Sequence, residues 1–191
     1  MVDFLCRRSD VDPAAIALYG VSQAGYWVPR AIAFEHRIAA AIADTGVVDV
    51  SQSWLRHLPQ EMVALLDRGD RATFNAMIAE GMLTDAKAAA TWNFRAHPYG
   101  GLDPYSTFAA MRRYRLDRAD AARITTPLLI TDPEGEQFWP DQAAQPAAMT
   151  RGVSTLVRFT AAEGANFHCE SMARLLVDQR MFDWLDRQVR Q

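Results

Sequence analysis

The stretch LYGVSQAGYW at residues 18–27 constrains the fold of this chain more than any other feature. Its apolar residues are typical of a buried strand, which reaches Gly20 two residues before Ser22. Small residues on both sides of a serine let a strand turn sharply into a helix, and such a turn exposes the serine hydroxyl. We therefore expect a strand, a tight turn that presents Ser22, and a helix.

Further strands and helices alternate along the chain. Short apolar runs before turn residues predict buried strands at residues 16–19 and 38–43. A third strand is expected at residues 128–131, and β-branched residues predict a fourth at residues 154–159. Helical spacing predicts helices at residues 23–35, 141–150 and 169–188. Pro29 falls inside the first helix and should kink or break a turn. The alternation favours an α/β fold with a mostly parallel sheet of about four strands.

Residues 51–118 interrupt this alternation with apolar residues at helical spacing. We expect a helical cap inserted between two parts of an α/β core, with segments 1–50, 51–118 and 119–191. Insertions of this kind commonly cover an active site and shape its pocket. A purely structural excursion is the alternative.

Charge and composition exclude several classes of partner. The net charge is −3 over 191 residues, and the basic residues are scattered, so we expect neither nucleic acid nor a membrane surface as a partner. No stretch approaches the ~20 apolar residues of a spanning helix. The first ten residues, MVDFLCRRSD, lack the apolar core of a signal peptide. These features favour a cytoplasmic protein that acts on a small molecule.

The cysteines and histidines indicate neither a cofactor nor a metal site. Two cysteines, Cys6 and Cys169, are too few for a disulfide framework and are expected to be free thiols that fill a core. The histidines are dispersed, and neither cysteine has the paired spacing of metal ligands.

A serine hydroxyl becomes a good nucleophile only when a base takes its proton, so Ser22 needs a histidine. His36 lies late in the helix after the serine, and His57 and His97 belong to the insertion. His168 lies in EGANFHCE, a loop that directly follows the last predicted strand. Because α/β sheets place their chemistry at the carboxyl ends of parallel strands, His168 is the best candidate base.

An acid is expected between the serine and the histidine. The segment LLITDPEGEQFWP supplies Asp132, Glu134 and Glu136 after the third strand, and Asp44 after the second strand is a further candidate. One of these carboxylates would hold the imidazole in its working tautomer. Each feature has an ordinary alternative, such as a capping histidine or a solvated acidic turn. Their order on consecutive strand ends is the more specific signal.

These residues resemble the α/β-hydrolases over nearly the whole chain. The similarity lies in IALYGVSQAGYWVPRAIAFEHRIAAAIAD, HPYGGLDPYSTF, TPLLITDPEGEQFWP and GANFHCE. The resemblance is to a subgroup that includes dihydroxypseudooxynicotine hydrolase, fungal polyketide-shortening hydrolases and the fermentation-respiration switch esterase. Dipeptidyl aminopeptidases are related more distantly. Ala24 departs from the usual pattern, which has glycine at that position.

The resemblance implies a role for each candidate residue. Ser22 matches the nucleophile and His168 the general base, while Glu136 matches the acid because it precedes the loop proline by four residues. Asp132, Glu134 and Asp44 stay open as alternatives. The backbone N–H of Gln23 would stabilise the oxyanion. Aromatic residues that would line the substrate pocket, or simply pack in the core, are Tyr26, Trp27 and Trp139.

The resemblance also implies that the N-terminal half of the family fold is absent, because only 15 residues precede Ile16. The strand before Ser22 would then have an unpaired apolar edge, and exposed edges tend to pair. We expect a homo-oligomer through that strand, or pairing with another polypeptide.

The sequence therefore predicts a serine hydrolase that cleaves an ester, an amide or an activated C–C bond of a small molecule. The alternative is a truncated hydrolase remnant or fragment with no activity of its own, because losing one of two oxyanion donors typically costs about 10²–10³ in rate.

Overall fold

The computed structural model describes residues 1–189, and this part of the chain forms two compact units. Of the described residues, the core unit comprises 1–49 and 115–189, and the helical unit comprises Val50–Tyr114. Each unit is described by itself. The last two residues of the predicted 119–191 segment lie outside the described part.

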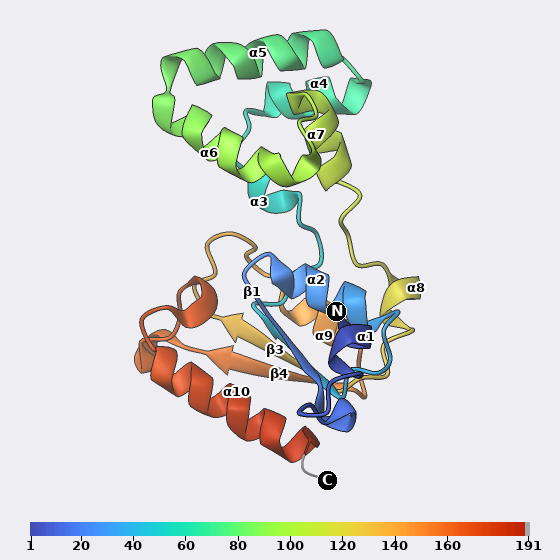
Figure 1. Cartoon of the computed structure of the whole chain (residues 1–191). Helices are drawn as coiled ribbons and strands as arrows, with labels where there is room; N and C mark the ends of the chain where they lie inside the picture. Colours follow the sequence, from blue (N-terminus) through green and yellow to red (C-terminus); the bar gives the residue numbers. More distant parts are fainter. Residues whose placement is uncertain (190–191) are drawn as a thin grey trace. The chain divides into compact units, whose positions relative to one another are not determined.

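The core unit contains one parallel sheet. Within the described residues it has four strands in the order β1-β2-β3-β4, and every neighbouring pair is parallel (Figure 1). The strands are β1 (Ala17–Val21), β2 (Ala40–Asp44), β3 (Leu128–Pro133) and β4 (Ser154–Phe159). The predicted α/β class with a four-stranded parallel sheet is therefore confirmed.

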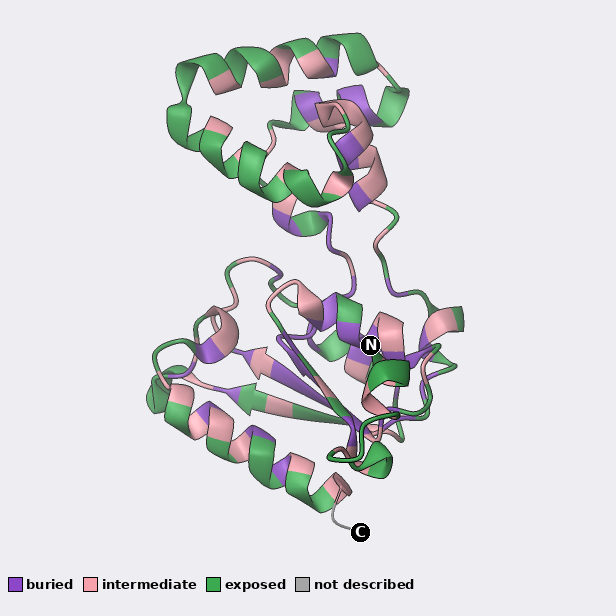
Figure 2. Cartoon of the chain, in the orientation of Figure 1, coloured by how far each residue is buried: buried purple, intermediate pink, exposed green. Residues whose placement is uncertain are grey.

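Helices cover both faces of this sheet, so alternate residues of the central strands face different helices. Val28 and Ile32 of helix α2 (Ala24–Ile32) pack with Ala41 and Ala43 on one face. Helix α10 (Arg174–Val189) packs on the other face, where its buried residues meet Ile42. All five residues of β2 are buried, as Figure 2 shows for the middle of the sheet. This two-sided burial explains why β2 is apolar almost throughout.

The remaining helical elements of the core unit are short. They are α1 (Val2–Leu5), α8 (Arg118–Ala121), α9 (Ala144–Met149) and the 3₁₀ turns Pro13–Ala15, Ala161–Glu163 and His168–Glu170. Helix α9 is shorter than the predicted 141–150, and α10 begins at Arg174 rather than at residue 169 because a separate turn carries His168. Helix α2 continues through Pro29 and ends at Ile32, so Pro29 does not break it.

The helical unit packs around aromatic side chains. Its helices are α3 (Gln52–Leu55), α4 (Gln60–Arg68), α5 (Arg71–Thr84), α6 (Ala86–Ala96), the 3₁₀ turn His97–Tyr99 and α7 (Pro104–Met111). Phe74 and Phe108 lie at its centre with ring centroids 5.4 Å apart. The Val50 N–H donates to the Tyr114 carbonyl at 3.1 Å, so the unit begins and ends at adjacent points. Across residues 1–189, no helix combines the length and apolarity needed to cross a bilayer.

Candidate active site

Ser22 occupies the turn between β1 and α2 in a strained backbone conformation. Its φ angle is +62°, a left-handed value that costs a non-glycine residue about 1–3 kcal/mol. Two backbone hydrogen bonds hold the turn: the Ser22 N–H donates to the Asp44 carbonyl at 2.5 Å, and the Ser22 carbonyl accepts from Gly25 at 2.8 Å. The turn therefore fixes Ser22 at the carboxyl edge of the sheet.

Two glycines permit this turn, because larger residues would collide with nearby atoms. A Cβ at Gly20 would lie 2.5 Å from Val28 Cγ2 and 2.8 Å from Ala24 Cβ. A Cβ at Gly25 would overlap the carbonyl oxygen of Thr45. The closest approach of α2 to the segment after β2 thus falls at Gly25, one position after Ala24. This explains how alanine is tolerated at position 24, where the family pattern has glycine.

Hydrogen bonds join the loop after β3 to the loop after β4. The Gly135 N–H donates to the Asn166 carbonyl at 2.8 Å, and the His168 N–H donates to Gln137 Oε1 at 3.2 Å. A Cβ at Gly135 would lie 3.1 Å from the Asn166 carbonyl oxygen, so the contact favours glycine. These bonds place Glu136 beside His168.

Ser22, His168 and Glu136 form a continuous chain of polar contacts. His168 Nε2 lies 2.8 Å from Ser22 Oγ. His168 Nδ1 lies 2.9 Å from Glu136 Oε1 and 2.8 Å from Glu136 Oε2. With the proton on Nδ1, the imidazole donates to Glu136 and leaves Nε2 free to accept from the Ser22 hydroxyl. This is the geometry that a general base requires to activate a hydroxyl.

Glu136 is held as a carboxylate. Its side chain is 7 % exposed, and its Oε1 accepts backbone N–H bonds from Phe138 at 2.7 Å and Trp139 at 3.1 Å. Burial raises the pKa of Glu136, but the hydrogen bonds from His168 and the two backbone N–H groups outweigh it, so the pKa lies below its usual value. The anion is therefore available to stabilise an imidazolium.

The other candidate acids have other partners. Asp132 accepts from Arg158 at 3.0 Å, and Glu134 accepts from the Ala161 N–H at 2.8 Å. Asp44 is fully buried and accepts from the Tyr19 hydroxyl at 2.8 Å. Glu136 is thus the candidate whose carboxylate contacts the imidazole.

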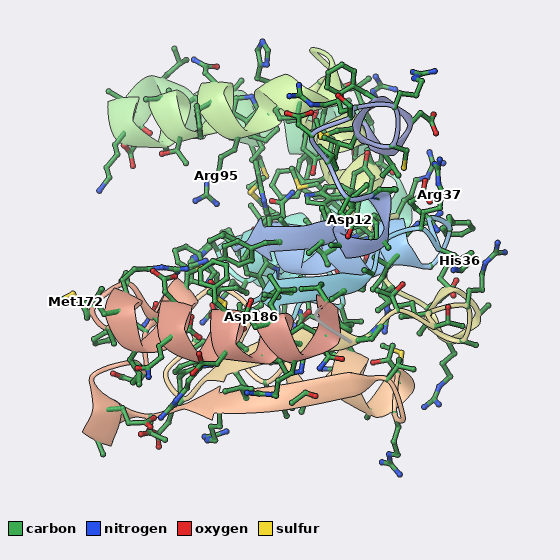
Figure 3. The ribbon with its side chains drawn as sticks, turned by 60° about the horizontal axis from the view of Figure 1, so that its bottom comes forward. Asp12, His36, Arg37, Arg95, Met172 and Asp186 are labelled. Carbon is green, nitrogen blue, oxygen red and sulfur yellow. The ribbon has the colours of Figure 1, made fainter. Side chains whose placement is uncertain are left out.

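The remaining histidines lie elsewhere. His36 precedes β2, at the amino end of the strands, and Figure 3 shows it at the opposite end of the core unit from Met172, which precedes α10. His57 and His97 belong to the helical unit.

Aromatic residues surround the imidazole. The ring centroids of Phe138 and Trp139 lie 4.5 and 5.7 Å from that of His168. Trp139 and Tyr26 are 3 % exposed, whereas Trp27 is 39 % exposed and meets Tyr26 edge-on. Packing against Phe138 and Trp139 restricts rotation of the His168 ring.

Sequence reasoning did not single out Phe138, Gly135 or Glu170. Phe138 and Gly135 lie in the segment LLITDPEGEQFWP, and Glu170 lies in GANFHCE. Both segments stand out in the sequence, but neither indicates where these three residues lie in the structure. Gln23, the predicted oxyanion donor, is the N-cap residue of α2 and follows Ser22 directly.

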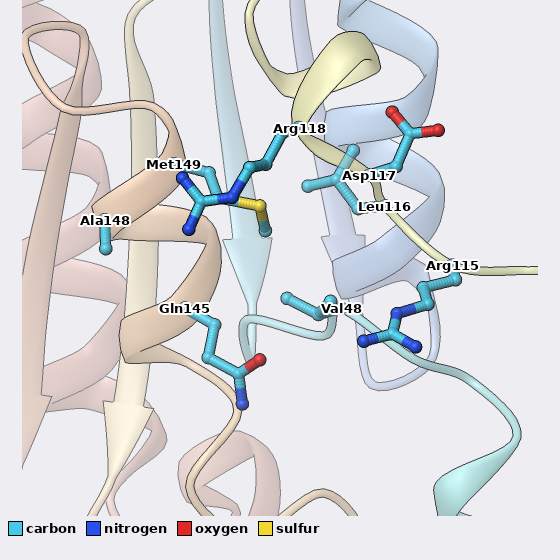
Figure 4. A pocket seen from close by; sticks show the side chains of 8 residues that line it. All are labelled: Val48, Arg115, Leu116, Asp117, Arg118, Gln145, Ala148 and Met149. Atoms are coloured by element: carbon cyan, nitrogen blue, oxygen red, sulfur yellow. The ribbon is translucent and has the colours of Figure 1, made fainter.

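A hollow of about 500 Å³ lies elsewhere in the core unit (Figure 4). Its lining residues are Val48, Arg115, Leu116, Asp117, Arg118, Gln145, Ala148 and Met149. None of the contacting trio Ser22, His168 and Glu136 lines it. Within residues 1–189, no group of three or more His, Cys, Asp and Glu side chains is arranged to hold a metal ion.

Comparisons with known proteins identify the fold. No family model and no curated protein sequence matches the chain. Among solved structures, 2,6-dihydroxy-pseudo-oxynicotine hydrolase is similar at 17 % identity with a TM-score of 0.68, over 98 % of this chain and 44 % of that one. The α/β-hydrolase GrgF from Penicillium sp. sh18 is similar at 18 % identity and a TM-score of 0.63, over 100 % of this chain and 69 % of that one.

A third similar structure is the AtxE2 isopeptidase in its S527A variant, at 19 % identity and a TM-score of 0.57, over 98 % of this chain and 24 % of that one. The chain therefore spans less than half the length of the first and third of these relatives. At identities this low, structural similarity shows the arrangement of the backbone. On this basis the protein has the α/β-hydrolase fold.

Proposed function

We propose that the protein is a serine hydrolase that cleaves an ester, an amide or an activated C–C bond of a small molecule. The observation that carries this proposal is the contact chain from Ser22 Oγ through His168 to Glu136, with 2.8 Å at the Ser22–His168 contact and 2.8–2.9 Å at the His168–Glu136 contact. The α/β-hydrolase fold supports it, because this fold presents a serine on a strained turn between strand and helix.

In the proposed reaction, Ser22 Oγ attacks the substrate carbonyl carbon while His168 Nε2 takes the hydroxyl proton. The carbonyl π electrons move onto oxygen, and the Gln23 N–H donates to the resulting oxyanion. When the C=O bond re-forms, the bond to the leaving group breaks, and the leaving group takes the proton from His168. A water molecule, deprotonated by His168, then attacks the acyl carbon, the bond from that carbon to Ser22 Oγ breaks, and His168 returns the proton to Ser22 Oγ.

The proposed substrate class follows from analogy with the similar structures and includes esters, amides and activated C–C bonds. The similar structures include a hydrolase of 2,6-dihydroxy-pseudo-oxynicotine and an isopeptidase, so different substrates are cleaved on this fold. For that reason we propose amide cleavage, as by an aminopeptidase, as one of the reactions. The exposed Trp27 ring and the partly buried Phe138 ring favour a substrate with an aromatic or apolar part.

A fluorophosphonate probe tests the proposed nucleophile. We expect the probe to add its phosphonyl mass to the wild-type chain at Ser22, and Ser22→Ala and His168→Ala to lose the labelling. Ser9→Ala, at an exposed serine outside the site, is the matched control and should label like the wild type. Equal labelling of wild type and Ser22→Ala would remove Ser22 from the mechanism.

A second candidate is a chain that has no turnover of its own. It is favoured by the fact that the chain covers 44 % of 2,6-dihydroxy-pseudo-oxynicotine hydrolase. Turnover of p-nitrophenyl acetate that disappears in His168→Ala would argue against this candidate. Labelling of Ser22 without any turnover would favour it.

A further inference from the structure

Glu170 is a buried acid that the proposed mechanism does not use. Its side chain is 0 % exposed, and within residues 1–189 neither carboxyl oxygen has a hydrogen-bond partner. It lies two residues after His168 and belongs to the same 3₁₀ turn, His168–Glu170. A buried carboxylate without donors is strongly unfavourable, so this group needs a physical explanation.

The groups that face Glu170 come from each neighbouring element. Asp44 of β2 and Arg174 of α10 act on it through their charges, Thr131 of β3 is a polar neighbour, and Cys169 precedes it. Asp44 Oδ1 already accepts from Thr131 at 3.0 Å, and Asp44 Oδ2 accepts from the Tyr19 hydroxyl of β1 at 2.8 Å. Arg174 lies 3.5 Å from Asp44 and bonds Asp178 at 2.6 Å. The donors of this cluster are therefore directed to other acids.

Two carboxyl groups in one buried site share their protons, because two adjacent negative charges repel each other. Burial, and next the negative charge of Asp44, raise the pKa of Glu170 to about 9. The raised pKa favours the protonated form of the Glu170 carboxyl group at neutral pH.

The backbone beside Glu170 is strained and depends on local contacts. Cys169 and Glu170 have φ angles of +53° and +45°, and two successive left-handed residues without glycine are unfavourable. The Glu170 N–H donates to the Phe167 carbonyl at 2.7 Å, and Cys169 Sγ lies 3.7 Å from the Asp44 carbonyl oxygen. The same carbonyl accepts from the Ser22 N–H, so the His168 turn and the Ser22 turn share one anchor.

We infer that Glu170 is a positioning residue: its fully buried carboxyl group, in the same 3₁₀ turn as His168, anchors the turn that presents His168 to Ser22. A negative charge on this buried group would destabilise that turn. The inference rests on the proposed function of Ser22 and His168. It predicts that the activity falls at alkaline pH through Glu170. Burial raises the pKa of the Cys169 thiol to about 12 and also raises that of Tyr19, so these two groups titrate above Glu170.

The first experiment measures the rate of fluorophosphonate labelling from pH 7 to 10. We expect the wild-type rate to fall about tenfold for each pH unit above about 9, and Glu170→Gln, which stays neutral, to lose this alkaline decline. Glu170→Ala should label about tenfold more slowly at pH 7.5, with rescue in Glu170→Gln. Glu61→Gln, at an exposed acid of the helical unit, should keep the wild-type decline.

The second experiment needs no activity. An acid whose pKa is raised in the folded state binds its proton there but loses it on unfolding, so stability falls as pH rises from about 4.5 to 9. Urea unfolding should show this slope in the wild type and a smaller one in Glu170→Gln. If that variant does not fold, Asp44→Asn replaces it and should shift the alkaline decline to lower pH, because it removes the negative charge that raises the pKa of Glu170.

The outcomes separate the two proposals. An unchanged alkaline decline and an unchanged stability slope in Glu170→Gln overturn the positioning role. If Glu170→Gln loses the stability slope but Ser22 is not labelled in any variant, the proposed function is overturned. The positioning role is then overturned with it. Loss of both the decline and the slope supports the inference.

Discussion

At the candidate active site, the strained Ser22 backbone and the paired His168–Glu136 side chains have different roles. The left-handed φ of +62° directs the serine toward the carboxyl edge of the sheet, where His168 Nε2 lies 2.8 Å away. Glu136, bonded by the backbone of its own turn, holds the imidazole. Because three separate loops meet here, a change in one side chain should alter rate more than stability.

Glu136→Gln should lower the hydrolytic rate by about 10³–10⁴, because an amide favours the wrong imidazole tautomer and cannot balance an imidazolium. The rate of p-nitrophenyl acetate turnover or of probe labelling measures this loss. Glu134→Gln is the matched control: Glu134 bonds the Ala161 N–H instead, and its variant should stay within about twofold of the wild type. Equal losses in both variants would contradict the assignment of Glu136.

Cys169 should be an unreactive thiol in spite of its place beside His168. Burial, and next the charge of Asp44, raise its pKa to about 12, and only the thiolate is nucleophilic. We expect iodoacetamide at pH 8 to leave Cys169 unmodified in the folded protein and to alkylate it in urea, as read by peptide mass spectrometry. Rapid alkylation of the folded chain would show that the site is more open or more positive than described.

At the scale of elements, the contact between α2 and Thr45, the residue that follows β2, depends on glycine. Gly25 approaches the backbone of Thr45 so closely that no side chain fits, whereas a Cβ at Gly81 in α5 would meet no atom within 4 Å. The two glycines therefore have opposite energetic roles, one required by packing and one unfavourable for its helix.

Gly25→Ala should destabilise the core unit by at least about 1–3 kcal/mol, because the atom that must move belongs to the backbone. Gly81→Ala should instead stabilise the exposed helix α5 by about 0.5–1 kcal/mol. Urea unfolding of the two variants against the wild type measures both changes. A Gly25→Ala protein as stable as the wild type would mean that α2 and β2 can separate without loss.

At the scale of the whole molecule, the described sheet has β1 and β4 at its edges. The two edges differ: β1 contains no charged residue, and Tyr19 and Val21 are 38 % and 45 % exposed. Strand β4 carries Arg158, which is bonded to Asp132. An uncharged exposed edge favours pairing with another strand, so self-association through β1 is the expected behaviour.

Ala17→Lys should weaken this self-association, because a lysine on an edge strand opposes pairing. Ala17 is exposed in β1, and Thr155→Lys places the same charge on exposed β4 as a control that should leave association unchanged. Sedimentation velocity over a range of concentrations measures the effect. A wild-type chain that stays monomeric at all concentrations would exclude the predicted pairing.

Local sequence was informative about strands because apolar and β-branched residues are concentrated in them. The β4 bounds coincide with the predicted 154–159, and β3 begins at the predicted residue 128. Helix ends were less accurate, since α9 and α10 begin where tertiary contacts and a separate turn allow, later than apolar spacing alone indicates. Pro29 is accommodated inside α2, where Val28 and Ile32 are buried against the sheet.

The sequence by itself determined the order of strands and helices, and with it the edge at which Ser22, His168 and the acids of the 132–136 loop must gather. Only the tertiary structure decided which acid contacts the imidazole and where Glu170 is buried. The physical reason is that strand ends follow from local hydrophobic patterns, whereas side-chain directions in irregular loops depend on contacts between distant residues. The bond from Gly135 to Asn166, which brings Glu136 to His168, is such a contact.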